Sequence, residues 1–80
     1  MNVINTENGE LVVFSSRYET PMSLMRDDGG DILLRIYRDG LSVKDIESMS
    51  PNTALHEKSI KAEVRLDIQG LVQALAKLSD

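Results

Sequence analysis

The C-terminal segment 60–80 changes from one hydrophobic period to another within a single turn. From Ile60 to Leu66 apolar residues alternate largely with charged ones, which is the two-residue period of a strand with one buried face. From Ile68 onward the apolar residues recur at the spacing of one helical face, at positions 68, 71, 72, 75 and 78. Asp67 stands at the junction, where its carboxylate can accept a hydrogen bond from a free amide of the first helical turn. The segment therefore predicts a strand followed directly by an amphipathic helix.

The strongest turn signal is Asn8-Gly9, which lies between two apolar runs. Both residues tolerate the positive φ angles of a tight hairpin turn. We therefore expect strands near Asn2–Glu7 and Glu10–Ser16. The second of these contains four consecutive apolar residues, Leu11–Phe14, and so presents apolar side chains to both faces. It is predicted to be a central strand, or one whose second face is covered.

Asp39-Gly40 predicts a second hairpin. It follows a predicted strand, Asp31–Arg38, and precedes a returning strand that begins at Leu41–Val43. The returning segment has an alternative, because Ser42 can cap a short helix with Asp45 in the capping-box position. The strand is the preferred interpretation, since the turn signal is good and the helix would have only two turns.

Three further segments are predicted to lie outside the sheet. Thr20-Pro21 can open a short helical turn, with Thr20 as the cap and Pro21 at the first helical position. The sequence Asp27–Gly30 ends that turn as a loop. Ser50–Thr53 interrupts regular structure, and the chain from there to Lys58 is expected to be a loop.

Together these elements predict one domain, residues 1–80, of the α+β class. Its expected architecture is a small antiparallel sheet of four to five strands with the C-terminal amphipathic helix packed on one face. The chain has one Phe, two Tyr and no Trp, so the core of this domain is expected to be aliphatic.

The residues that carry most protein chemistry are scarce. The chain has no cysteine, which excludes a disulfide framework, a thiolate metal site and a cysteine nucleophile. Its single histidine, His56, has no second zinc ligand beside it and is expected to be exposed. The acidic segment Asp27–Asp31 is expected to be a solvated turn, because a calcium loop begun at Asp27 would have Arg38 at its twelfth position. We therefore expect no catalytic residue, no metal and no cofactor.

The formal net charge is −4, from 13 acidic and 9 basic residues. This balance argues against direct binding to nucleic acid phosphates. The N-terminus lacks the basic region and apolar run of a signal peptide, and no apolar stretch reaches membrane-spanning length. We therefore expect a cytoplasmic protein that does not contact a membrane.

The predicted sheet has two apolar faces. If Ile32, Leu34 and Ile36 point toward the C-terminal helix, the opposite face has the composition of a protein interface. A helix of about eleven residues spans only ~16 Å and cannot cover both faces. A second copy of the chain is the simplest cover for the other face, so a homodimer is expected. The alternative is that segments 20–25 or 50–58 cover it. The residues of this candidate interaction surface are Leu33, Arg35, Tyr37, Lys61 and Arg65.

The sequence thus predicts a non-enzymatic protein–protein interaction module. It would be a small acidic accessory or inhibitor-type protein that binds a larger protein partner. The alternative is a protein linked to nucleic acid, either a weak binder through the basic and aromatic sheet face or an acidic competitor of a DNA-binding enzyme. An enzyme is not expected, because no catalytic constellation is present in the sequence.

Overall fold

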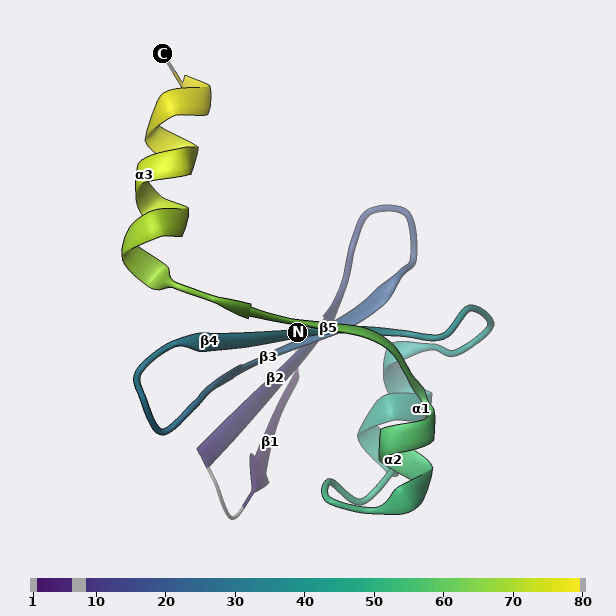
Figure 1. The fold of residues 1–80 in the computed structure, drawn as a ribbon. Helices are drawn as coiled ribbons and strands as arrows, with labels where there is room; N and C mark the ends of the chain where they lie inside the picture. Colours follow the sequence, from purple (N-terminus) through teal and green to yellow (C-terminus); the bar gives the residue numbers. More distant parts are fainter. Residues whose placement is uncertain (1, 7–8, 80) are drawn as a thin grey trace.

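The structure is a computed structural model, and it describes residues 2–6 and 9–79. Five antiparallel strands form one sheet in which every strand pairs with its neighbours in sequence (Figure 1). The α+β class and the antiparallel sheet are confirmed. The strands are β1 (Asn2–Thr6), β2 (Gly9–Ser15), β3 (Pro21–Arg26), β4 (Ile32–Tyr37) and β5 (Ile60–Leu66). The described helices are α1 (Val43–Ser48), α2 (Ala54–Lys58) and α3 (Ile68–Ser79).

The first hairpin has the predicted position. Strands β1 and β2 pair with Thr6 opposite Gly9, and Gly9 adopts a positive φ of 122°. Asn8, the other predicted turn residue, lies outside the described residues. β2 lies between β1 and β3, so the prediction of a central strand is confirmed.

The segment after Thr20 is strand β3, so the predicted helical turn is wrong. β3 pairs with β2 on one side and with β4 on the other. The chain reverses just before it, where the Ser16 hydroxyl accepts hydrogen bonds from the amides of Tyr18 and Thr20 and Glu19 adopts a φ of 64°. Pairing on both edges outweighs the local helix signal, because a helix here would leave the backbone groups of β2 and β4 without partners.

The segment after Gly40 is helix α1, so the preferred prediction of a returning strand is wrong and the alternative is correct. Gly40 makes the predicted turn with a φ of 86°. The Ser42 hydroxyl accepts a hydrogen bond from the Asp45 amide (3.2 Å), and the Asp45 carboxylate accepts one from the Ser42 amide (2.8 Å). β5 occupies the edge of β4 that a returning strand would need.

Helix α2 replaces the loop predicted before Lys58. Thr53 caps this helix, because its hydroxyl accepts a hydrogen bond from the amide of His56 (3.2 Å). Helices α1 and α2 lie against the same face of the sheet, which we call the covered face. The buried core lies between that face and the helices and is centred on Leu11, Val13, Tyr37 and Ile46.

The opposite side of the sheet is here called the open face. The side chains of Ile32, Leu34 and Ile36 point to the open face, and those of Leu33, Arg35 and Tyr37 to the covered face. The Leu33, Arg35 and Tyr37 side, which the sequence predicts to face away from the C-terminal helix, is the side that the structure covers. Helices α1 and α2 cover that face, and each buries one side chain against it, Ile46 from α1 and His56 from α2.

The junction between β5 and α3 forms as predicted. The Asp67 carboxylate accepts a hydrogen bond from the Gly70 amide (3.1 Å), and the Asp67 carbonyl accepts one from the Leu71 amide (2.9 Å). α3 extends from the end of β5 away from the sheet (Figure 1), and none of its described residues is buried. Within the described residues, α1 and α2 rather than α3 cover the sheet. A single residue between β5 and α3 is too short to reverse the direction of the chain.

Candidate interaction surface

The five residues predicted to form an interaction surface lie on the covered side of the sheet or beside it. Tyr37 is only 1% exposed, so it cannot contact a partner. Leu33 and Arg35 are half-buried, whereas Lys61 and Arg65 are exposed. The register of β4 and β5 places Leu33 opposite Arg65. The structure therefore brings these residues near one another but not into one free surface.

The cations among these five residues each lie beside a carboxylate of the same chain. Salt bridges between neighbouring side chains neutralise much of the field that a polyanion would recognise. These three cations therefore offer little excess positive charge. The nitrogen–oxygen distances are 2.9 Å for Arg35–Glu63, 3.1 Å for Arg65–Asp27 and 3.8 Å for Lys61–Asp39.

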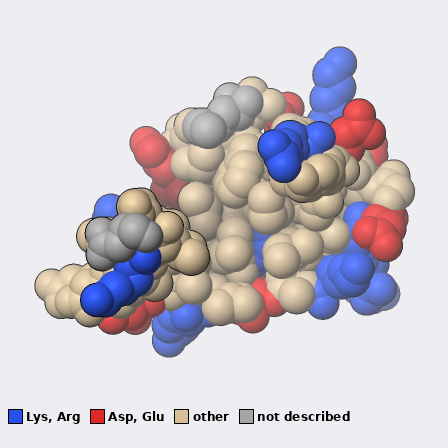
Figure 2. Space-filling model, turned by 90° about the horizontal axis from the view of Figure 1, so that it is seen from above, with Lys and Arg blue, Asp and Glu red and all other residues tan. Residues whose placement is uncertain are grey.

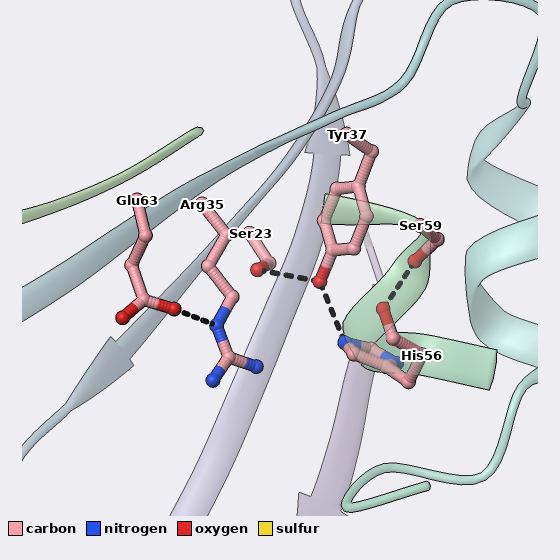
Figure 3. A network of polar contacts seen from close by, with 6 residues as sticks. All are labelled: Ser23, Arg35, Tyr37, His56, Ser59 and Glu63. Atoms are coloured by element: carbon pink, nitrogen blue, oxygen red, sulfur yellow. Dashed lines mark hydrogen bonds and ion pairs between the residues drawn. The ribbon is translucent and has the colours of Figure 1, made fainter. Parts of the chain in front are cut away.

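A buried polar cluster joins β3, β4 and α2 (Figure 3). The Tyr37 hydroxyl lies 2.9 Å from the Ser23 hydroxyl and 2.9 Å from Nε2 of His56. The rings of Tyr37 and His56 meet edge to face, with their centroids 5.5 Å apart. The Ser59 hydroxyl donates a hydrogen bond to the His56 carbonyl. The prediction of an exposed histidine is wrong, because α2 places His56 against the sheet with 1% exposure.

Burial determines the protonation of this cluster. It lowers the pKa of His56 below the usual histidine value of 6.5, and the nearby Arg35 adds to the shift while Glu57 opposes it. Burial also raises the pKa of Tyr37 above 10.0. Both side chains are therefore neutral near pH 7. Ser23, Tyr37 and His56 are each at most 1% exposed, so a substrate cannot reach them and the cluster serves the packing of α2.

The carboxylate of Asp27 stabilises the acidic loop between β3 and β4. Oδ1 of Asp27 accepts hydrogen bonds from the amides of Gly29 (2.9 Å) and Asp31 (3.0 Å), while Oδ2 faces Arg65. Across residues 2–6 and 9–79, no group of three or more acidic, histidine or cysteine side chains is placed to hold a metal ion.

The open face carries apolar side chains on all five strands. One row crosses all five strands in register through Val3, Val12, Leu24, Leu34 and Val64. Because α1 and α2 lie on the other side and α3 extends away, no described helix covers this row. Figure 2 looks onto this side and shows a broad central area with few charged side chains and with most Lys, Arg, Asp and Glu at its margins. Flanking apolar residues on the same face are Phe14, Met22, Ile32, Ile36, Ala62 and Leu66.

Helix α3 presents a second uncovered apolar surface. Its apolar residues fall within one stripe of about 120°, which is the pattern of a helix that packs against another element. Four residues of that stripe are between 39% and 82% exposed: Leu71, Val72, Leu75 and Leu78. The periodicity of the sequence predicted this stripe, but the helix was expected to pack with it on the sheet of the same chain.

Comparison of the chain with protein-family models, with curated proteins and with solved structures found no match. None of the described helices is long and apolar enough to cross a membrane. The geometry and composition of the described residues point instead to the open face and α3, which differ from the five residues predicted from the sequence.

Proposed function

We propose that this protein is a non-enzymatic protein–protein interaction module that binds a protein partner through the open face and α3. The observation that carries the proposal is the apolar row that runs from Val3 to Val64 without a cover. Val3 and Val64 are exposed at the two ends of this row, and Val12, Leu24 and Leu34 are half-buried between them. Contiguous apolar surface that no other element covers marks interaction sites in proteins. In this role the small acidic chain acts in the cytoplasm as an accessory or inhibitor of a larger protein.

The composition of the open face supports a protein partner. Its centre is aliphatic, and its aromatic and thioether side chains, Phe14 and Met22, belong to residue types that are enriched in protein interfaces. The charged side chains that share this face, Glu10 and Arg26, lie at its margin. An apolar centre with a polar rim is the usual arrangement of a protein–protein interface.

The nucleic-acid alternative has weaker support. A binder needs unpaired cations for phosphates and accessible aromatic rings for bases. Arg35 and Arg65 lie beside carboxylates, and Tyr37 is buried. The open face has an apolar centre that suits side chains rather than phosphates. These contacts favour the interaction module.

The test is capture of partners from a lysate of the source cells, with nuclease added, followed by mass spectrometry. The key variant is Leu34→Glu, which places a charge in the centre of the open face. Gln73→Glu is its matched control, because it adds the same charge on the polar side of α3. A protein retained by the wild type and by Gln73→Glu but lost by Leu34→Glu supports the proposal.

Two results would contradict the proposal. Equal capture by all three proteins, with circular dichroism confirming that they are folded, would show that the open face is not the binding surface. Capture that disappears on nuclease treatment would favour the nucleic-acid alternative.

A further inference from the structure

Each chain presents two apolar surfaces that do not cover each other. One is the open face, and the other is the stripe of α3 that contains Leu71 and Leu75. A helix of twelve residues without tertiary packing is only marginally stable in water. α3 therefore needs an apolar surface against which to fold.

The chain connection directs α3 away from its own sheet. Asp67 alone separates β5 from α3, and both its carboxylate and its carbonyl accept hydrogen bonds from the first helical turn. The helix leaves the sheet on the side opposite α1 and α2 (Figure 1). A return over its own sheet would require a reversal, which ordinarily takes a loop of about two to six residues. The open face of the same chain therefore does not supply the surface that α3 needs.

The dimensions and charges of the two surfaces match. α3 has twelve residues and is about 18 Å long. Five strands spaced at about 4.8 Å make the sheet about 19 Å wide. The one charged residue between Ile68 and Ser79 is Lys77, which lies on the helix side opposite the apolar stripe. No charge of α3 would therefore be buried if the stripe lay on the open face.

The exposed area is also larger than that of a compact monomer. The chain has a mass of 8.9 kDa and an accessible surface of 5805 Å². A folded monomer of this mass is expected to expose about 4,800 Å². The excess is about 1,000 Å² per chain, so two chains could bury about 2,000 Å² together, which is the upper range of stable interfaces.

We infer that the open face is occupied by a second copy of this chain, and that the two copies exchange α3 reciprocally. The stripe of each α3 lies across the open face of the partner. With twofold symmetry, each α3 covers one open face and each open face is covered by one α3. No apolar surface is then left for a third chain, so the assembly stops at two chains. This inference rests on the proposed function, because it names a second copy of the chain as the protein partner of that same surface.

The first experiment measures the mass of the purified full chain by size-exclusion chromatography with light scattering at micromolar concentration. The expected mass is twice 8.9 kDa. A mass of 8.9 kDa over the whole concentration range would overturn the inference.

The second experiment compares Leu75→Glu with Gln73→Glu, two changes of equal charge on opposite sides of α3. Leu75→Glu is expected to raise the dissociation constant of the dimer by at least about 100-fold, because it buries an unpaired carboxylate in the contact. Gln73→Glu is expected to change it by less than about threefold. A Leu75→Glu chain that remains as dimeric as the control would overturn the exchange.

The third experiment does not depend on a variant that folds. Isotope-labelled and unlabelled wild-type chains are mixed, and nuclear Overhauser effects between the two populations are recorded. The expected contacts join methyl groups of α3, such as Leu75, to those of the open face, such as Leu34. Contacts only between two helices, or only between two sheets, would overturn the exchange.

The outcomes separate this inference from the proposed function. A purified chain that is monomeric but still captures a protein through the open face overturns the dimer and leaves the interaction module intact. A chain that exchanges α3 but captures no other protein supports the dimer, and it contradicts the proposal of a larger partner.

Discussion

The hydroxyl of Tyr37 lies 2.9 Å from Nε2 of His56, and this contact ties the end of β4 to α2 inside the protein. The same hydroxyl lies 2.9 Å from that of Ser23 on β3. A buried polar atom that loses its hydrogen-bond partner also lacks water, which costs free energy. Among the described residues Nδ1 of His56 has no hydrogen-bond partner, so Nε2 makes the hydrogen bond that holds this ring. The Tyr37–His56 contact therefore determines where α2 can pack on the sheet.

Replacement of Tyr37 by Phe tests this contact directly. The ring would still fill the core, but Ser23 and His56 would both lose a buried hydrogen-bond partner. We expect the free energy of unfolding to fall by about 1–3 kcal/mol, measured by urea denaturation at pH 7. Tyr18→Phe is the control, because Tyr18 is 73% exposed and the expected change is within about 0.5 kcal/mol. Equal effects of the two changes would contradict a structural role for the buried hydroxyl.

The stability of the fold is expected to decrease in mild acid. Burial, with a further contribution from Arg35, lowers the pKa of His56 in the folded state below its unfolded value of 6.5. Below pH 6.5 the unfolded chain takes up a proton at His56 that the folded chain does not, so the free energy of unfolding falls until the folded pKa is reached. Above pH 6.5 this contribution to stability is complete. Urea denaturation between pH 5 and pH 8 measures the effect.

The variant His56→Gln identifies the group responsible for this pH dependence. It should lower stability at pH 7 and also remove the component of the pH slope that begins at 6.5. An unchanged slope in this variant would assign the pH dependence to the carboxylates instead.

Ile46 is the buried side chain that α1 contributes to the core, with an exposure of 0%. Ile46→Ala should lower the free energy of unfolding by about 2–5 kcal/mol, because it removes apolar contacts and leaves a cavity. Leu55→Ala on α2 is the matched control, since Leu55 is 63% exposed and should contribute within about 0.5 kcal/mol. Thermal or chemical denaturation of both variants makes the comparison. A neutral Ile46→Ala would show that α1 does not cover the sheet.

The capping box at the start of α1 should contribute measurably to stability. Ser42→Ala removes the hydroxyl that accepts a hydrogen bond from the Asp45 amide, and it should cost about 1 kcal/mol. Ser50→Ala, at an exposed position beyond the end of α1, is the control and should be close to neutral. If the two serine variants unfold at the same denaturant concentration, the cap does not stabilise α1.

Local signals in the sequence located several elements correctly. The turn at Gly9, the loop after Asp27 and the change of period at Asp67 are all present in the structure. Each depends on residues that lie close together in the chain, such as a side chain that caps the next turn. The capping box of Ser42 and Asp45 was also visible, but the turn signal at Gly40 was compatible with a strand as well.

Other elements depended on partners that are distant in the sequence. β3 forms because β2 and β4 both offer backbone groups for pairing, although its own sequence begins like a helix. His56 is buried against the sheet, where its ring contacts the hydroxyl of Tyr37 on a strand 19 residues earlier in the chain. Neither relationship leaves a periodic or local trace in the sequence.

The sequence by itself determined the class of the fold, the strand–helix junction at Asp67 and the amphipathic character of α3, because hydrophobic period and capping act over a few residues. Only the tertiary structure decided which face of the sheet is covered. β4 carries apolar side chains on both faces, including Leu34 on one and Tyr37 on the other, so its own pattern allows either choice. The choice was made by α1 and α2, which bury Ile46 and His56 on the Tyr37 side and leave the Leu34 side open.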